Sequence, residues 1–518
     1  MIREISRRKC LRLWLCKPEY MERTKWENRF VLLRFRKKNY MMFLKDLKRY
    51  QMERLYDKLK AYSESDFYAF HMPGHKGKEV IGCERQDITE IDGADVLSHA
   101  DGIIKKSQEN AAKLFGSGAT FYSTEGSSQC IKTMLAAVFM DYKIRQEQKS
   151  SGSTKSSTKP FVLAARNVHK SMIDALALLD LSVEFMYPKD ADSICVSMVT
   201  PDDVKRELEK KQKPVAIYIT SPDYLGNTAD IEGISKVCEK CDIPLIVDNA
   251  HGAYQAFLDE KKYGTVHPIQ SGAAICCDSA HKTLPVLTGG AYIHVSEKYR
   301  ERLAHHIASY MTIFGSTSPS YLIMQSLDMC NRYLDGKFRA ELADCIKRIE
   351  KTKAVLAENN VSLMETEPLK IVIDTAAAGM QGEELADELR RYRIECEYAD
   401  KYFVVLMITP QNDEIDFERL EKWAFDTKDF RNKKGKLVPK KLVLSRAERV
   451  LGIREAVFSP YKKVKVSDAC GRICASQTIA CPPAIPIAVC GERIDENMIE
   501  IFKEYAIEYI NVVDNRYI

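Results

Sequence analysis

The sequence predicts an α/β protein whose central sheet is mainly parallel and has helices on both faces. Residues 214–222 (PVAIYITSP) and 243–251 (IPLIVDNAH) are continuous apolar runs of strand length, and residues 232–241 between them follow a helical pattern. Fully apolar strands that alternate with helices are typical of parallel sheets covered on both sides. Such sheets bind their ligands beyond the carboxyl ends of the strands.

Elements of the same kind surround these two strands. A helix over 107–116 ends at Gly116, and a short strand over 119–124 leads through a glycine turn into a long helix over 128–148. The polar stretch 149–160 ends that helix. We expect further strands at 161–167, 273–281 and 291–295, and a helix at 171–180.

The pattern changes along the chain, and we expect four segments. Residues 1–45 form a basic extension with weak packing, and residues 46–335 form the major domain. Residues 336–430 are predicted to be a smaller α+β domain, and a charged linker (426–439) leads out of it. Residues 431–518, rich in Pro, Gly and short apolar runs before a last helix, are predicted to be a C-terminal α+β domain.

The charge is concentrated at the start of the chain. The net charge of all 518 residues is +5, but the first 50 contain 16 Lys and Arg against 5 Asp and Glu, so the remainder carries −6. A basic start is compatible with nucleic-acid or anionic-membrane contact. We favour a poorly ordered extension, or an upstream start codon with Met41 and Met42 as natural starts, and we expect no nucleic-acid or membrane partner.

The sixteen cysteines are scattered among apolar runs. Because the sequence has no secretory signal and no run of 18 apolar residues, we expect a cytoplasmic protein with reduced thiols. Cys238 and Cys241 have CxxC spacing, but no second pair accompanies them, so we interpret them as ordinary thiols and predict no metal site.

Polar clusters follow five of the expected strands. Each has an ordinary explanation by itself: a serine that caps a helix, a turn aspartate, a core histidine, a surface lysine. Together they combine a phosphate-binding turn, a buried carboxylate, an imidazole and an amine, which are the groups that pyridoxal phosphate requires. The clusters are STEGSSQ (123–129), RNVHKS (166–171), TSPDYLG (220–226), DNAHG (248–252) and DSAHK (278–282).

The chain resembles the Orn/Lys/Arg decarboxylase family from about residue 50 to its end, in the short form of Gram-positive bacteria that lacks an N-terminal wing domain. The resemblance implies an aminotransferase-like (fold type I) major domain that binds pyridoxal 5′-phosphate. The matching stretches are FHMPGHKG (70–77), 87–116, 123–129, 166–171, IVDNAHGAY (246–254), DSAHKTLPVLTGGAYIH (278–294), STSPSYLIMQSLD (316–328) and CPPAIPIAVCGERI (481–494).

The resemblance also implies roles for individual residues. Lys282 would hold the cofactor covalently, and Asp248 would keep its pyridine nitrogen protonated. His169 and Ala250 would lie against the two faces of the ring. The phosphate would be held by Gly126, Ser127, Ser128, Ser279 and His281, and Ser316 and Thr317 would reach the cofactor of a neighbouring subunit in a homodimer or higher homo-oligomer.

The implied reaction is decarboxylation of a basic amino acid, which gives agmatine, cadaverine or putrescine, with Lys282 or His281 returning a proton to Cα. Glu492 is the candidate carboxylate for the terminal cation of the substrate. An aminotransferase or carbon–carbon lyase of the same fold stays open, as does a non-catalytic regulatory relative. Departures such as Asn249 and Glu125 leave the choice among arginine, lysine and ornithine open.

Overall fold

The computed structural model describes residues 54–65, 67–149, 159–187, 193–196, 198–210, 212–264, 266–428, 444, 446–476, 485–514 and 516. The chain divides into two units, Met1–Glu53 and Arg54–Ile518, and every described residue belongs to the second. The basic extension, most of the 149–160 loop and most of the charged linker therefore lie outside the described residues, and the domain boundaries set from the sequence stay predictions.

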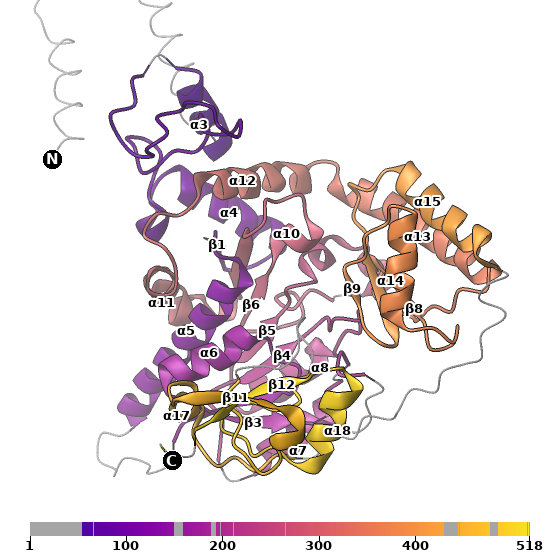
Figure 1. Ribbon diagram of the computed structural model, residues 1–518. Helices are drawn as coiled ribbons and strands as arrows, with labels where there is room; N and C mark the ends of the chain where they lie inside the picture. Colours follow the sequence, from indigo (N-terminus) through magenta and orange to yellow (C-terminus); the bar gives the residue numbers. More distant parts are fainter. Residues whose placement is uncertain are drawn as a thin grey trace, which may run out of the picture. The chain divides into compact units, whose positions relative to one another are not determined.

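A seven-stranded sheet forms the centre of the second unit (Figure 1). Its order is β1-β7-β6-β5-β4-β2-β3, and only β7 runs against the other strands of this sheet. The prediction of a mainly parallel sheet is confirmed. The strands are β1 (Ala119–Ser123), β2 (Phe161–Ala165), β3 (Ser182–Met186), β4 (Ile217–Thr220), β5 (Leu245–Asp248), β6 (Ile275–Asp278) and β7 (Ala291–Val295).

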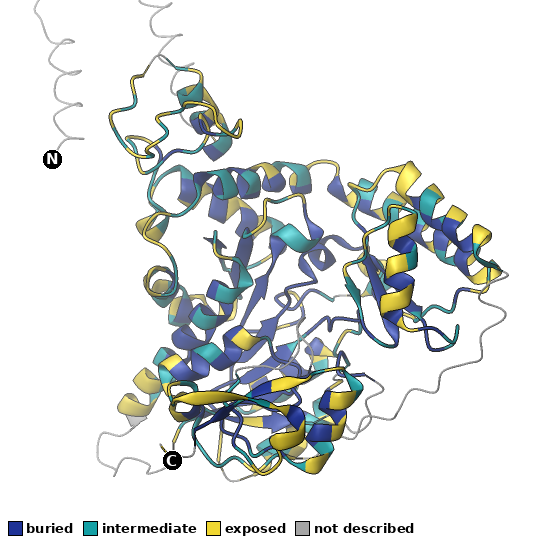
Figure 2. Ribbon diagram, in the orientation of Figure 1, coloured by how far each residue is buried: buried dark blue, intermediate teal, exposed yellow. Residues whose placement is uncertain are grey.

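Helices cover both faces of this sheet because successive strand residues point to opposite sides. Cys276 packs in one apolar cluster with α8, while its neighbour Cys277 packs in another with α5 and α6. Figure 2 shows the resulting pattern, with the sheet strands buried and the outer helix faces exposed. The helices of the major segment are α3 (Leu55–Ser63), α4 (Ile103–Phe115), α5 (Gly126–Lys149), α6 (Lys170–Leu179), α7 (Pro201–Leu208), α8 (Ile231–Lys240), α9 (Glu260–Tyr263), α10 (Ala280–Thr283), α11 (Arg300–Ile313) and α12 (Tyr321–Asp335).

Two smaller sheets follow in the chain. β8 (Lys370–Asp374), β10 (Phe403–Met407) and β9 (Tyr398–Ala399) form an antiparallel sheet, and β11 (Tyr461–Lys465) pairs with β12 (Tyr509–Val513). The accompanying helices are α13 (Phe338–Glu358), α14 (Gly382–Arg391), α15 (Glu414–Asp426), α17 (Ile453–Val457) and α18 (Glu496–Glu504). The predicted α+β character of both C-terminal parts is confirmed.

Local sequence explains where several elements end. α4 ends at Gly116, whose φ of 69° is the left-handed conformation that glycine adopts without strain. The predicted strand over 273–281 is shorter than expected: β6 ends at Asp278, and α10 follows, so the Lys282 amine is presented by a short helix. Cys238 and Cys241 are free thiols at the end of α8, and burial raises the pKa of Cys238 to about 12, which disfavours the reactive thiolate.

Within the described residues, no helix combines the length and the apolar character needed to cross a membrane.

Candidate active site

Four of the parallel strands deliver polar residues to one edge of the sheet. β5 ends at Asp248, and β6 is followed by Ser279, His281 and Lys282. β2 leads to His169, which caps α6, and β1 leads to the glycine turn at the start of α5. Because these strands run in the same direction, their carboxyl ends meet at the same edge, where α/β proteins bind ligands.

The Lys282 amine lies in a partly enclosed environment. Its Nζ is 3.1 Å from Nε2 of His251, a buried residue. Burial lowers the pKa of Lys282, with the charge of Asp248 acting in the opposite direction. Burial, followed by the nearby charge of Lys282, lowers the pKa of His251 well below its usual value. A lysine with a lowered pKa is the form of this residue that acts as a nucleophile or a base.

Asp248 is buried at the end of β5 with few partners for its charge. The Tyr218 hydroxyl donates to its Oδ2 at 3.1 Å, and the backbone N–H of Ala250 donates to its Oδ1 at 3.3 Å. The charge of Asp248 raises the pKa of both His169 and Lys282 against the larger effect of burial, so these three residues belong to one electrostatic site.

The two imidazoles predicted for this site are held by local hydrogen bonds. His169 Nδ1 accepts from the backbone N–H of Ser171 at 3.2 Å, which fixes the ring at the start of α6. His281 Nδ1 donates to the Gly290 carbonyl at 3.0 Å. Burial lowers the pKa of both rings, so both are neutral near pH 7. Ala250 is also buried beside Asp248.

Several polar atoms at this edge of the sheet have no hydrogen-bond partner among the described residues. Ser279 Oγ, Thr283 Oγ1, Thr220 Oγ1 and His251 Nδ1 are all buried in this state. Buried polar groups in native proteins are nearly always satisfied, so unpartnered groups gathered at the strand ends indicate the place of a ligand. Among these four residues, Ser279 at the start of α10 is the one that the sequence predicts to bind the phosphate group of the cofactor.

The glycine turn before α5 has the geometry of an anion cradle. Gly126 adopts φ 69°, and nothing lies within 4 Å of the position where a Cβ would stand. Ser127 and Ser128 follow in the first turn of the helix, half-buried, where backbone N–H groups lack helical acceptors. Open space beside these donors fits a phosphate at the N-terminus of a long helix.

Ser316 and Thr317 are exposed on the chain between α11 and α12. With Thr124 and Glu125 they line a cavity of about 240 Å³ beside the glycine turn. Their predicted contact with the cofactor of a second subunit stays a prediction.

The structure contradicts the role predicted for Glu492. Arg166 Nη1 and Nη2 donate to its two carboxylate oxygens at 2.6 and 2.7 Å, and Arg449 Nη2 lies 3.3 Å from Oε1. The backbone N–H of Val489 donates to Oε2 at 2.8 Å, and Glu492 is 2% exposed. Both oxygens are therefore occupied, and this carboxylate has no free face for the cation of a substrate.

A different carboxylate, Glu397, acts on the amine through its charge. The charge of Glu397 raises the pKa of Lys282 and of His281 against the effect of burial. Its Oε1 accepts from the Tyr224 hydroxyl at 2.7 Å, and the Tyr224 ring packs edge-on against His251. Glu397 directly precedes β9 of the second sheet and is exposed to solvent.

Sequence reasoning missed three of these residues. His251 and Tyr224 stand within the strand-end clusters 248–252 and 220–226, so their positions were visible although their roles were not. Glu397 follows no strand of the central sheet, and no signal in the sequence connects it with Lys282.

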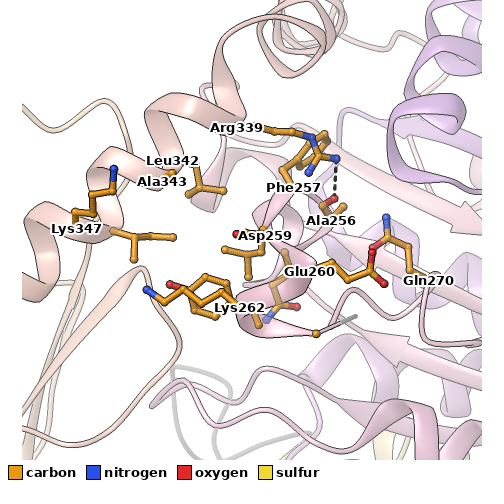
Figure 3. A pocket seen from close by; sticks show the side chains of 15 residues that line it. Ala256, Phe257, Asp259, Glu260, Lys262, Gln270, Arg339, Leu342, Ala343 and Lys347 are labelled. Atoms are coloured by element: carbon orange, nitrogen blue, oxygen red, sulfur yellow. Dashed lines mark hydrogen bonds between the residues drawn. The ribbon is translucent and has the colours of Figure 1, made fainter.

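A separate, wider cavity of about 760 Å³ lies beside α9 and α13 (Figure 3). Arg339 spans one side of it, over the Phe257 ring and with Nη2 donating to the Ala256 carbonyl at 3.3 Å. Its lining, taken from the described residues, includes none of the residues predicted for the active site.

Fold and site together define an α/β enzyme built around a desolvated lysine at the carboxyl edge of a mainly parallel sheet. Comparison with known proteins identifies the family. Residues 53–377 match the Orn/Lys/Arg decarboxylase major domain, and residues 448–515 match the C-terminal domain of the same family. The chain therefore belongs to the Orn/Lys/Arg decarboxylase family, and it is a decarboxylase.

Individual relatives agree with this assignment. An arginine decarboxylase of Bacillus anthracis is 28% identical, with 87% of this chain and 92% of the relative covered. An uncharacterised protein of Bacillus subtilis is 30% identical, with 86% and 92% covered. Among solved structures, lysine decarboxylase A from Pseudomonas aeruginosa superposes with a TM-score of 0.71 at 14% identity, over 92% of this chain and 81% of that one, and this similarity supports the fold.

Proposed function

We propose that the protein removes the α-carboxylate of arginine, lysine or ornithine with pyridoxal 5′-phosphate as cofactor, and releases agmatine, cadaverine or putrescine with CO2. The observation that carries this proposal is the desolvated Lys282 amine, 3.1 Å from His251 and within the electrostatic reach of Asp248 and Glu397. The similar arginine and lysine decarboxylases support the choice of substrates.

The residues present fit this cofactor. The unpartnered Ser279 hydroxyl and the open turn at Gly126 provide donors for a phosphate, with Ser127, Ser128 and His281 beside them. Lys282 would hold the cofactor covalently, and His169 and Ala250 would lie against its ring. When bound, the protonated pyridine ring accepts the electron pair that the departing CO2 leaves behind.

Asp248 would keep that ring protonated. Its carboxylate is fixed by the Tyr218 hydroxyl and the Ala250 N–H, and it is buried among apolar strand residues. A buried carboxylate attracts a proton-bearing cation strongly, because water does not screen its charge.

Lys282 and His251 would handle the proton that the α-carbon takes up. Burial keeps the His251 ring neutral, so its Nε2 accepts a hydrogen bond from the Lys282 amine at 3.1 Å. A proton held between these two nitrogens lies at the carboxyl edge of the sheet, where the substrate would bind. His281 donates its one N–H from Nδ1 to the Gly290 carbonyl, so its Nε2 would offer a lone pair that accepts a proton in the same turn.

Glu397 would bind the terminal cation of the substrate. It is a carboxylate on the second sheet whose charge reaches Lys282 and His281, and the Tyr224 hydroxyl orients it at 2.7 Å. A charge-assisted hydrogen bond to this carboxylate would favour basic side chains over neutral ones.

We further propose that the enzyme is a cytoplasmic homodimer or larger homo-oligomer in which Ser316 and Thr317 reach a neighbouring site. One segment of the chain exposes several large apolar side chains. Monomeric proteins seldom expose such a group, so this segment supports contact with a second subunit. The exposed side chains are Phe67, Tyr68, Phe70, Met72, Val80 and Ile81. Thirteen free cysteines in the described residues are consistent with a reducing compartment.

The test is to supply purified protein and cofactor with arginine, lysine or ornithine, and to measure CO2 and the amine product. We expect equal amounts of CO2 and one amine. Production of a keto acid without CO2 would favour an aminotransferase of the same fold, and the absence of turnover with all three amino acids would contradict the proposed substrates.

A further inference from the structure

A second cluster of reactive side chains lies at the end of β6, immediately before Ser279, and has no part in the proposed reaction. It consists of His267, Cys276, Asp278 and His294, and each of these side chains has 0% exposure. Four groups that bind protons or metals, closed off from water in one place, require a physical explanation because isolated buried charges are costly.

The geometry brings their donor atoms together. One ligand atom each from His267, Cys276 and Asp278 lies within 4.8 Å of the others. Asp278 Oδ2 is 3.0 Å from His267 Nε2 and 3.3 Å from His294 Nε2. Cys276 and Asp278 are two residues apart on β6 and so point to the same face, and Cys276 faces His294 across the pair of β6 and β7.

An unpartnered nitrogen points into this cluster. His294 Nε2 is fully buried and has no aligned hydrogen-bond partner among the described residues, although it lies close to the Asp278 carboxylate. Because this nitrogen makes no aligned hydrogen bond, it is better explained as a metal ligand, which uses the lone pair, than as a hydrogen-bond donor.

We propose that His267, Cys276, Asp278 and His294 bind a divalent transition metal ion, with Zn²⁺ as the best match to the four donors. Imidazole, thiolate and carboxylate are the ligands of zinc in proteins, and four protein ligands without an open position are typical of structural sites. The charges also balance, since one thiolate and one carboxylate neutralise Zn²⁺ in a place without water. Binding releases the thiol proton of Cys276.

Neighbouring residues support the ligands from outside. Asn249 Nδ2 donates to Asp278 Oδ1 at 2.7 Å, which leaves Oδ2 toward the two imidazoles. Thr120 Oγ1 lies 2.8 Å from His294 Nδ1, so that nitrogen can donate to the hydroxyl while Nε2 faces the metal. Metal-bound histidines commonly have such an oxygen behind them.

The position of the site suggests its purpose. Asp278 directly precedes Ser279, and Asn249 directly follows Asp248, so the metal would tie together the two strand ends that carry the active site. The ligands come from three separated stretches of the chain without the paired spacing of common zinc motifs, which is why the sequence predicts no metal.

The experiment measures metal content and needs no decarboxylase activity, so its outcome is independent of the proposed function. The full chain is produced in medium supplied with Zn²⁺, or with Co²⁺ in its place, and the bound metal is measured after removal of loosely held ions by a chelator. We expect about one metal ion per chain, and thiolate-to-cobalt charge-transfer absorbance in the Co²⁺ form.

Variants identify the ligands. Cys276→Ser should lose the charge-transfer absorbance, while Cys238→Ser, a buried cysteine in the same apolar cluster, should keep it. Thr120→Val leaves all four ligands in place and should weaken metal binding about tenfold or more. A folded wild-type protein that contains no metal from either medium would overturn the proposal, since His267 would then serve only as a hydrogen-bond partner of Asp278. Cobalt absorbance that survives Cys276→Ser would overturn it as well.

Discussion

The Lys282 site and the Arg166–Glu492 pair are both buried centres of charge, yet they differ in how their polar atoms are satisfied. Each guanidinium nitrogen of Arg166 and both oxygens of Glu492 have partners. Around Lys282, by contrast, Ser279, Thr283 and His251 keep buried polar atoms that have no partner in the part of the chain that the structure describes. A buried charge whose polar atoms all have partners indicates a structural role, which we call a closed set of partners. A buried site with polar atoms left unpartnered, an open set, indicates a place for a ligand.

The closed pair also connects distant parts of the chain. Arg166 follows β2 and stands three residues before His169, while Glu492 lies 326 residues further on. The pair therefore holds the C-terminal part against the turn that presents the His169 ring. Its effect on the site is to position this turn, without contact with a substrate.

The largest effect is expected in the open site. Lys282→Ala should lower kcat by about 10³-fold or more, because the amine is both the covalent anchor and a proton carrier. It should change the stability of the fold little, since the site lacks a closed set of partners. Steady-state CO2 release and thermal unfolding measure the two effects, with Lys236→Ala as an exposed lysine control. Retained activity in the Lys282 variant would contradict the assignment.

The next largest effect is expected in the closed pair, and on stability. Glu492→Gln leaves the buried Arg166 charge uncompensated, which costs about 3–5 kcal/mol in the free energy of unfolding. Urea denaturation measures this cost. Replacing both residues with apolar ones (Arg166→Met with Glu492→Leu) should recover much of it. Loss of substrate affinity in Glu492→Gln without loss of stability would instead restore the substrate role predicted from the sequence.

A moderate effect is expected at Glu397. Glu397→Gln should raise KM for the basic substrate about tenfold, because a charge-assisted hydrogen bond is lost. The reaction of a neutral amino acid of similar length should not change. Glu395→Gln removes a neighbouring exposed carboxylate that pairs with Arg390 and serves as the control. Equal changes of KM in both variants would argue against a specific role for Glu397.

The smallest effect concerns pH. The pKa values of His251 and His169 are lowered on folding, so the unfolded chain binds more protons than the folded one as the pH falls through the usual histidine range. The stability of the protein without cofactor should therefore be full above about pH 6.5 and should decrease below it. His251→Gln should weaken this dependence, and an unchanged pH profile would show that His251 is not buried in its neutral form.

Much of the fold and part of the site follow from local sequence. Asp248 and Lys282 each stand at the end of an apolar run, so the alternation of strands and helices was enough to bring them to one edge of the sheet. Glu397 and Glu492 do not obey this rule. Their partners lie far away in the chain, Tyr224 for one and Arg166 for the other, and only tertiary packing decides which carboxylate is paired and which stays available.

The most direct test of the account is to find the lysine that carries the cofactor. The protein is incubated with pyridoxal 5′-phosphate, reduced with borohydride, digested and mapped by mass spectrometry. We expect the reduced cofactor on Lys282 alone. Its attachment to Lys370, a buried lysine, or to no single lysine, would contradict the central claim.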